Sequence, residues 1–394
     1  MIPRGAPYIG WSDLLAAALH CLDPRSPRAA QRDVEAFWAS NTVACLSVRT
    51  GLDAMLQVLA FPAGSEVVVS AITIPHILDI LAKHELVAVP VDLDLDTLSV
   101  GASALRAVIT GKTKAILVAH LFGSRMPMDD IVRVARDAGV MLLEDCAQAN
   151  DGSGYRGHDD SDVTMFSFGS IKRQTALGGG LLRFNDPALA DKVRAMVESY
   201  PRQSRLSYFK RVLTMVFIKS VASYPVFQLF VALCRLARKD HDETLGTALR
   251  GFRHGDLFAR LRHQPSAPML RVLGRRLRQS LDVPIAERVA VVQAVTREFV
   301  ELPRPGSGAS HHTHWLFPVM TPEPERLKLH LWAKGFDATA GASNLLSVPA
   351  PEGRHVAENA ERFMREVLYL PLYPDATTTQ MRSLARVLRD FDPA

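Results

Sequence analysis

The chain has 394 residues, 48% of them hydrophobic and 22% charged, and its formal net charge is +5. These values are typical of a globular protein that divides into a large and a small domain, and they exclude a disordered or low-complexity chain. The four cysteines, Cys21, Cys45, Cys146 and Cys234, have neither CxxC nor other metal-binding spacing, which predicts free thiols in a reducing compartment and no metal site.

Residues 1–40 are predicted to form an N-terminal arm with short helices. Ser26 stands directly before a helical pattern and is a candidate N-cap. The first residues, MIPRGAPYIGWSDLL, lack the basic segment followed by an apolar segment that a signal peptide has. We therefore expect a cytoplasmic protein.

Seven apolar runs rich in β-branched residues alternate with helical stretches between residues 43 and 184. They are VACLSV, SEVVVSAI, LVAVPVDL, AILVAHLF, VMLLEDCA, VTMFSFG and GGLLRF. Several runs are too continuously apolar to have one face in water, which is typical of a sheet covered by helices on both faces. The pattern predicts a large α/β domain with three α/β/α layers, which we place at residues 41–240.

Residues 206–238, inside that range, are very apolar but carry Lys210, Arg211 and Lys219 and are interrupted by Pro225. The apolar stretches are too short and too broken to predict a transmembrane helix. Two interpretations remain open. The segment is either a helix pair buried in the protein or in an oligomer, or a pair lying on a membrane surface with its basic residues toward anionic headgroups.

Positive charge is concentrated between residues 200 and 282. Sixteen Lys and Arg stand there against five acids, so this segment is +11 and the remainder about −6. The asymmetry indicates an anionic partner or a solvated basic face. Because no aromatic interleaving or known motif accompanies the arginines, we do not predict nucleic-acid binding. Residues 241–283 are expected to be a basic connecting region.

The last part of the chain mixes helical and strand patterns and predicts a smaller α+β C-terminal domain, residues 284–394. The expected strands are HWLFPVM and EVLYLPLYP, and the expected helices include PEPERLKLHLWAKG and TTTQMRSLARVLRDF. His311, His312 and His314 follow a Pro/Gly/Ser linker without a carboxylate or cysteine beside them. We therefore predict a surface loop there and not a metal site.

Three residues with chemical potential lie at or near the ends of apolar runs. Asp145 ends one run, Ser167 lies in the next, and Lys172 follows five residues later. Ligands of α/β sheets bind beyond the carboxyl ends of the strands. A desolvated lysine can form a Schiff base with pyridoxal phosphate while a carboxylate keeps the pyridine nitrogen protonated. Taken singly, Asp145 is equally a helix cap and Lys172 is more often a surface lysine.

Thr50 and Gly51 lie between the first apolar run and a helical stretch. A helix N-terminus after a turn of small residues favours an anion, because its backbone N–H groups are free and the helix dipole is positive there. Together with Ser167, this turn predicts a site for a phosphate group.

Blocks in this order resemble the DegT/DnrJ/EryC1/StrS family: TGLDAML, SEVVVSAITIP, VPVDLDLDTLSV, KTKAILVAHLFG, LLEDCAQA, FSFGSIK, GGG and VLYLPLYP. The resemblance covers residues 40–200 well and 315–390 loosely. It implies a fold-type I, pyridoxal-phosphate-dependent enzyme, in most members a homodimeric aminotransferase acting on nucleotide-linked keto sugars. It implies these roles: Lys172 as the Schiff-base lysine, Asp145 as the partner of the pyridine nitrogen, Gln148 beside the ring, Ser167 as a phosphate ligand, and Gly51 with Leu52 as the phosphate-binding turn through backbone amides.

The chain departs from the family pattern on the substrate side. Gly51-Leu52 stands where the family has Gly-Thr, and the position of the aromatic residue that stacks on the pyridine ring is Ile74, with His76 two residues on. The asparagine-containing block that reaches a neighbouring subunit's phosphate is not visible. Residues 200–283 stand in its place.

We therefore expect a homodimeric aminotransferase that moves an amino group from an amino acid donor, glutamate by expectation, to a keto group. The acceptor is a nucleotide-linked sugar or a related carbonyl compound that bears a phosphate or a lipid. Two alternatives remain open. One is a pyridoxal-phosphate enzyme of elimination or carbon–carbon chemistry, and the other is a catalytically weakened binding or scaffold paralogue.

Overall fold

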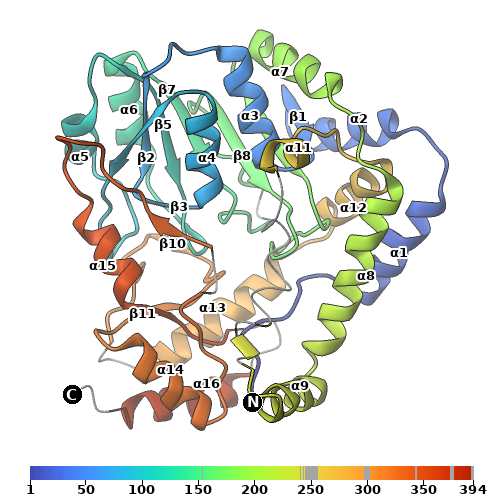
Figure 1. Ribbon diagram of the computed structural model, residues 1–394, viewed down its shortest axis with the longest axis vertical. Coiled ribbons are helices and arrows are strands. Elements are labelled where there is room, and N and C mark those ends of the chain that lie inside the picture. The colour runs from blue at the N-terminus through green and yellow to red at the C-terminus, as the bar shows by residue number, and fades with distance from the viewer. Residues whose placement is uncertain are drawn as a thin grey trace.

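The large unit of the computed structural model is built on a seven-stranded sheet (Figure 1). The structure describes residues 1–152, 154–239, 241–242, 244, 256–296, 302–341, 344–372 and 377–391. The seven predicted apolar runs form the strands of the sheet. In sheet order they are β1 (Thr42–Cys45), β9 (Gly180–Phe184), β8 (Val163–Ser167), β7 (Met141–Asp145), β5 (Thr113–Ala119), β2 (Glu66–Ser70) and β4 (Val87–Val91). Strand β9 is antiparallel to both its neighbours, and β8, β7, β5, β2 and β4 run parallel.

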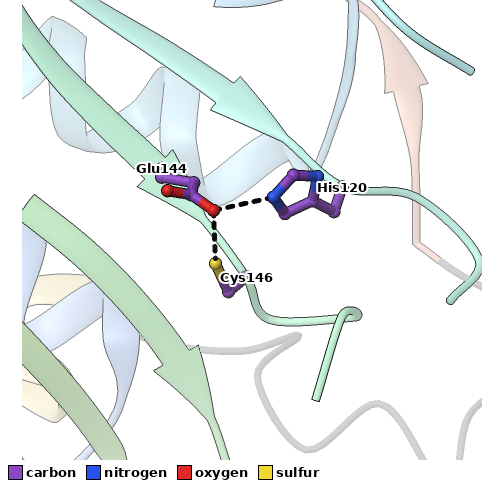
Figure 2. A group of neighbouring side chains, drawn as sticks. All are labelled: His120, Glu144 and Cys146. Atoms are coloured by element: carbon purple, nitrogen blue, oxygen red, sulfur yellow. Dashed lines mark hydrogen bonds and ion pairs between the residues drawn. The ribbon is translucent and has the colours of Figure 1, made fainter. Parts of the chain in front are cut away.

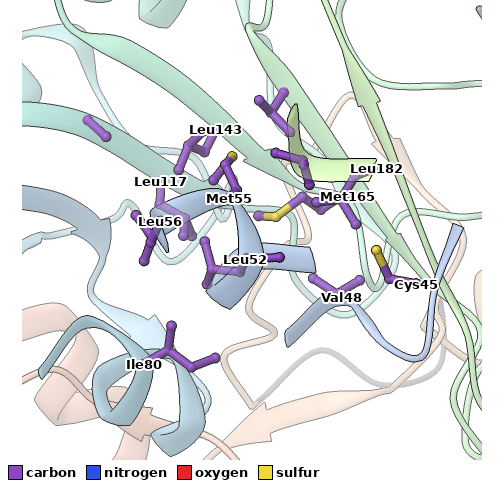
Figure 3. Close-up of a cluster of buried hydrophobic side chains, with 14 of the residues drawn as sticks. Cys45, Val48, Leu52, Met55, Leu56, Ile80, Leu117, Leu143, Met165 and Leu182 are labelled. Atoms are coloured by element: carbon purple, nitrogen blue, oxygen red, sulfur yellow. The ribbon is translucent and has the colours of Figure 1, made fainter. Parts of the chain in front are cut away.

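Helices cover both faces of the sheet, which confirms the three-layer prediction. On one face α3 (Val48–Leu59), α4 (Pro75–Lys83) and α7 (Pro187–Ser199) pack on a core that includes Leu143 and Met165 (Figure 3). On the other, α5 (Ala102–Val108) and α6 (Asp129–Ala138) cover β2, β4, β5 and β7. Alternation along the strands causes this division, because Leu143 faces the first core and Leu142 the second.

The N-terminal arm contains α1 (Trp11–Leu22) and α2 (Pro27–Trp38). Ser26 caps α2 as predicted, since its Oγ accepts a hydrogen bond from the Arg28 amide at 3.3 Å. All four cysteines are free thiols, also as predicted. Both helices pack against α12 (Ala267–Leu277), which lies in the segment expected to be a connecting region. That expectation is corrected here, because α12 is buried in the core of the large unit.

Several cations of the basic segment are neutralised by acids from elsewhere in the chain. Arg262 pairs with Asp53, Arg271 with Asp23, and Arg275 and Arg276 both pair with Asp13. The first pair attaches α11 (Leu257–Leu261) to α3, and the others attach α12 to the N-terminal arm. The predicted basic face is therefore partly internal. Residues 245–255 of the expected connecting region lie outside the described residues.

Two short segments of the large unit, on either side of residues 204–263, pair with each other. Arg202 and Gln264 are bridge partners, and the Gln203 amide donates to the Gln264 carbonyl at 3.0 Å. The segment between them contains α8 (Arg205–Val221) and α9 (Tyr224–Leu236). Among the described residues no single helix is long and apolar enough to cross a membrane, although α8 and α9 together pass that test with a bend of 91° between them.

Elements after residue 281 share a core of their own. They are α13 (Asp282–Thr296), β11 (Pro318–Met320), α14 (Pro324–Ala333), β13 (Val367–Tyr369) and α16 (Thr378–Arg389). The other elements of this part of the chain are β10 (His311–His312), β12 (Leu346–Ser347) and α15 (Glu358–Glu366), and α15 packs in a cluster with residues of the large unit. Two short ladders join this unit to β6 (Ser124–Arg125) and β3 (Ile72–Thr73) of the large unit. The domain boundaries at 41, 240 and 284 stay predictions.

Two expected strands of the C-terminal unit are shorter than predicted. HWLFPVM is a strand only at Pro318–Met320, because Trp315 and Leu316 instead donate to the carbonyl of Phe122. EVLYLPLYP is a strand only at Val367–Tyr369, and its last residues, 373–374, lie outside the described residues.

The three histidines do not form the expected surface loop. His312 and His314 are half-buried with their rings stacked 4.2 Å apart. Burial lowers the pKa of His312 to about 3 and that of His314 to about 4, so both rings are neutral at physiological pH.

Candidate active site

Lys172 lies in the turn after β8, at the carboxyl end of the parallel strands. Its amide donates to Gly169 O at 2.9 Å, and its carbonyl accepts from the Thr175 amide at 3.0 Å. The ammonium group lies 4.2 Å from the centre of the Trp315 ring. Burial, with Arg49 adding repulsion, lowers the pKa of Lys172 to about 8 against the opposing attraction of Asp145. The amine is therefore neutral in part at ordinary pH, and the neutral amine is the nucleophilic form.

Asp145 ends β7, the strand beside β8, so its side chain projects from the same edge of the sheet as Lys172. One carboxylate oxygen accepts the Ala147 amide at 2.9 Å. Burial raises the pKa of Asp145, although this amide and the charge of Lys172 favour the ionised form. The structure brings these two predicted residues together.

Gln148 and Ser167, the two other residues predicted here, each follow or end one of the two strands, β7 and β8. Gln148 Oε1 accepts the Phe122 amide at 2.8 Å, which fixes the side chain against the loop after β5. Ser167 is the last residue of β8 and lies opposite Gly180 in the ladder with β9. Its hydroxyl is half-buried at the strand end, where it is available to an anion.

The turn before α3 differs from its predicted form. Ser47 is the N-cap and accepts the Thr50 amide at 3.2 Å, so the helix begins at Val48. The Gly51 amide donates to Ser47 O at 3.2 Å, and Leu52 is fully buried in the core shown in Figure 3. The amides that precede the helical hydrogen-bond pattern are those of Val48 and Arg49. The candidate phosphate turn therefore moves from Gly51 and Leu52 to Val48 and Arg49.

Thr50 does not present its hydroxyl to this turn's outer side. Its Oγ1 donates to the carbonyl of Leu261 at 2.8 Å and lies 3.0 Å from Ser47 Oγ, and the residue is fully buried. Thr50 thus holds α11 against the start of α3. The predicted contact between Thr50 and a phosphate would have to use its backbone.

Ile74 and His76 begin α4 across from this turn. Ile74 is the residue before the helix and packs partly on the core beneath the sheet. His76 Nδ1 lies 2.9 Å from Arg49 Nη1 and accepts from it, which puts the ring proton on Nε2. Burial and the charge of Arg49 lower the pKa of His76, so the ring stays neutral.

Glycines 178–180 lie between the end of β8 and the start of α3. A side chain on Gly180 would place Cβ 2.4 Å from the Val48 nitrogen, and one on Gly178 would lie 3.1 Å from Arg211 Nη1. Gly178 and Gly179 also have positive φ angles of 154° and 106°. The triplet allows the Ser167 strand end, the α3 turn and α8 to approach one another.

Three residues at this site were not predicted from the sequence: Arg49, Arg211 and Trp315. Arg49 directly precedes Thr50 and Gly51 of the predicted phosphate turn, so its positive charge was visible in the sequence as a sign of an anion site. Arg211 comes from α8, where its Nη1 donates to Leu177 O at 3.3 Å. Trp315 comes from the C-terminal unit. For these two, the sequence shows no local pattern that links them to Lys172.

A second polar cluster lies directly behind Asp145, on the opposite side of β7 (Figure 2). Glu144 accepts hydrogen bonds from His120 at 2.9 Å, Cys146 at 3.3 Å, Ser161 at 2.7 Å, the His158 amide at 2.8 Å, and Tyr155. His120 Nδ1 accepts the Met126 amide at 3.2 Å, so its Nε2 carries the proton toward Glu144. These groups satisfy one another, which makes the cluster a hydrogen-bond network and not a vacant set of metal ligands.

Comparison with known proteins relates the chain to aminotransferases. The model of the DegT/DnrJ/EryC1/StrS aminotransferase family matches residues 32–215. Among solved structures, DesV of S. venezuelae in complex with a ketimine intermediate is 23% identical, with a TM-score of 0.69 and 98% of each chain covered.

Two further structures are equally similar in fold. The sugar aminotransferase CalS13 of Micromonospora echinospora is 17% identical, with a TM-score of 0.69 over 99% of this chain and all of that one. The aminotransferase TlmJ of Streptoalloteichus hindustanus is 19% identical, with a TM-score of 0.68 over 99% and 98%. These similarities confirm the fold-type I architecture.

Proposed function

We propose that Lys172 holds the cofactor of this protein, a pyridoxal-phosphate-dependent aminotransferase whose residues 32–215 match the model of the DegT/DnrJ/EryC1/StrS aminotransferase family. The observation that carries this proposal is the position of Lys172 and Asp145 on adjacent strand ends, with the pKa of the lysine lowered to about 8. A lysine of lowered pKa opposite a carboxylate is the pair that this cofactor requires.

The residues present fit the cofactor. Asp145 would hold the pyridine nitrogen protonated, and the turn at Val48 and Arg49 with Ser167 would bind the phosphate. Glycines 178–180 let the turn before α3 pack directly against the chain that follows Lys172, since a Cβ on Gly180 would lie 2.4 Å from the Val48 nitrogen. When bound, pyridoxal phosphate would supply an electron sink for the electron pair left at Cα of the amino acid when the bond between Cα and its hydrogen breaks.

Lys172 has a second task in this proposal. Its amine, when free, would act as the base that takes the proton from Cα of the amino acid and as the acid that gives the proton back, while the cofactor would supply the electron sink. The lowered pKa of Lys172 suits both steps, because a base works best when its pKa lies near the working pH. Trp315 covers the amine and restricts its exposure to water.

For the substrates, we propose glutamate as donor and a nucleotide-linked keto sugar, or a related carbonyl compound bearing a phosphate or a lipid, as acceptor. The family supports transfer to a sugar, and CalS13 is described as a sugar aminotransferase. The cationic groups around Lys172, namely Arg49 and Arg211, suit anionic ligands. We also propose a homodimer.

The test of the cofactor site uses purified protein mixed with pyridoxal phosphate. We expect a visible absorption band, and after borohydride reduction a covalent adduct on the peptide that contains Lys172. Lys172→Ala should abolish both, while Lys219→Ala on α8 should change neither. A reduced adduct on another lysine, or a wild-type protein that stays colourless, would contradict the proposal.

The test of the reaction uses nitrogen-labelled glutamate and a nucleotide-linked keto sugar. Transfer of label to the sugar supports an aminotransferase. A protein that binds the cofactor but releases other products without moving the label is instead an enzyme of elimination or carbon–carbon chemistry. A protein that binds it without any turnover is a scaffold paralogue.

A further inference from the structure

Three helices of the large unit expose apolar stripes. Eleven large apolar side chains on them are between 42% and 84% exposed: Trp11, Leu15, Leu19 and Leu22 on α1, Leu206, Leu213 and Phe217 on α8, and Val226, Leu229, Leu233 and Leu236 on α9. Within each helix the spacing of three, four or seven residues places these side chains on one face. We call these eleven residues the three-helix surface. Apolar groups gathered in this way mark a binding surface.

The stripes of α1 and α8 point outward together. Lys219, near the end of α8, lies 5.7 Å from the Trp11 ring at the start of α1. Arg205, at the start of α8, influences the pKa of Cys21 at the end of α1. The two helices therefore run antiparallel and side by side (Figure 1). Their opposite faces, which include Leu14 and Tyr208, are buried in the same core.

Helix α9 follows α8 after a bend of 91°, and it too has an exposed apolar face. Phe227, Val231 and Cys234 form the buried face of α9. Leu229 and Leu233 lie on its exposed face, one helical turn apart. The surface is thus formed by two neighbouring helices and a third one across their end.

Charge on this surface is of one sign. Residues 201–239 contain eight Lys and Arg and no Asp or Glu. Lys210 is exposed in the α8 stripe itself, and Arg238 and Lys239 are exposed just after α9. On the neighbouring arm, Asp13 and Asp23 are held in ion pairs with Arg275 and Arg271. The surface is therefore both apolar and cationic.

Apolar side chains together with positive charge favour one of two possible binding partners, a second copy of the chain or an anionic lipid bilayer. A second copy of the chain, docked by twofold symmetry, would bring the same cations together and lose their hydration without an opposite charge. An anionic bilayer neutralises the cations with its headgroups and takes the apolar side chains into the boundary beneath them. We infer that the three-helix surface docks onto an anionic lipid bilayer, with α1, α8 and α9 lying in its interface.

This inference goes beyond the proposed function and does not rest on it. The segment that carries α8 and α9 closes on itself through Arg202 and Gln264. None of the seven central strands lies in that segment. A membrane surface is also consistent with the shape of the helix pair, because a flat or re-entrant pair needs no single spanning helix.

The first experiment is sedimentation of the full chain with vesicles at low salt, without added cofactor or substrate. We expect binding to vesicles that contain phosphatidylglycerol, at least tenfold weaker binding to vesicles of phosphatidylcholine alone, and release as salt rises. Failure to bind the anionic vesicles at low salt would overturn the inference, whatever the cofactor tests show.

The second experiment separates the surface from non-specific attraction. The double variant Phe217→Ser/Leu233→Ser should bind anionic vesicles at least about tenfold more weakly, because two apolar side chains no longer enter the bilayer. Leu329→Ser/Val356→Ser removes equally exposed apolar groups from the C-terminal unit and should bind as wild type. Circular dichroism and thermal melting would show that both variants are folded.

Sedimentation velocity without lipid tests the competing occupant. Equal vesicle binding by wild type and the Phe217→Ser/Leu233→Ser variant would overturn the inference. So would a wild-type dimer that this variant dissociates while vesicle binding stays absent, because the surface would then belong to a second copy.

Discussion

Arg211 shows at the scale of a single residue how the candidate site is completed. Its guanidinium contacts Leu177 O beside the glycine triplet, and its charge lowers the pKa of Arg49, after the larger effect of burial. Two guanidinium groups close together are stabilised by a shared anion, and a phosphate accepts charge-assisted hydrogen bonds from both. We propose that Arg211 on α8 makes, within the same chain, the phosphate contact that the sequence resemblance assigns to a neighbouring subunit.

Arg211→Gln is therefore expected to weaken the binding of pyridoxal phosphate. Losing a hydrogen bond to a charged group costs about 1.5–3 kcal/mol, which corresponds to a roughly 10–100-fold higher dissociation constant. An absorbance titration with the cofactor measures it. Lys210→Gln, one residue earlier and exposed, is the matched control and should bind as wild type, while Arg211→Lys should recover part of the affinity. Unchanged affinity in Arg211→Gln would mean that Arg211 only anchors α8.

Asp145, Ser167 and Lys172 could be predicted because each is placed by a strand that the sequence marks clearly. Asp145 and Ser167 are the last residues of their strands, and the antiparallel pairing of β8 with β9 at Ser167 and Gly180 fixes the turn that carries Lys172. The α3 turn was placed at Gly51 and Leu52, about one helical turn too late, because Ser47 caps the helix and the helix begins at Val48. Arg211 could not be found, since its distance from Lys172 depends on how α8 packs.

The end of β7 is the element on which the site depends most. Its last two residues point to opposite faces, Asp145 toward Lys172 and Glu144 into the network of Figure 2. That network ties β7 to β5 through His120 and to the following loop through Tyr155 and Ser161. The position of Asp145 is thus held from behind.

Glu144→Gln is expected to destabilise the fold by about 2–4 kcal/mol, because the amide NH₂ would face the groups that donate to the carboxylate. Urea unfolding measures the change. Glu325→Gln is the control: its exposed carboxylate pairs with Lys328, and the change should stay within about 0.5 kcal/mol. A loss as small as that of the control would show that the network contributes little.

The same variant predicts a pH dependence. Burial raises the pKa of Glu144, but the hydrogen bonds from His120, Tyr155 and Ser161 prevail, so the pKa lies below its ordinary value of 4.5. A depressed carboxyl pKa contributes stability above the unfolded-state value and loses it as the pH falls. The difference in stability between wild type and Glu144→Gln should therefore shrink below about pH 4.5. A difference that stays constant down to acid pH would contradict this.

Elements with simple patterns were predicted well, and those stabilised by distant charges were not. The seven strands are continuous apolar runs whose burial does not depend on partners far away. Helix α12 looked like a connector because Arg271, Arg275 and Arg276 make it basic. Its burial depends on Asp13 and Asp23, some 250 residues earlier, and no local pattern contains that information.

At the scale of the whole molecule, the C-terminal unit holds the lysine turn. The buried Arg173 donates to Thr313 Oγ1 at 2.6 Å and to Thr313 O at 2.5 Å, and Trp315 donates from its ring to Ile171 O at 3.3 Å. The residues on both sides of Lys172 are therefore tied to one segment of the other unit. Any movement between the units changes the setting of the lysine.

Arg173→Ala is expected to cost about 2–4 kcal/mol of stability, because Thr313 loses its buried, charged donor. Arg326→Ala, which removes an exposed pair with Glu323, should cost no more than about 0.5 kcal/mol. Urea unfolding compares the two. If Arg173→Ala were as stable as the control, the attachment of the units would have to come from their apolar contacts.

Helix α8 has one face at the candidate active site and another on the three-helix surface, and both belong to the same helix. Tyr208 and Arg211 hydrogen-bond to the carbonyls of Ala176 and Leu177 behind the lysine turn, while Leu213 and Phe217 belong to the three-helix surface. A ligand that shifts one face of α8 also shifts the other face. Such coupling is reciprocal: if membrane binding raises the affinity of the protein for the cofactor by some factor, the cofactor raises the affinity of the protein for the membrane by the same factor. The enzyme would then be allosteric, with membrane binding and cofactor binding coupled through α8.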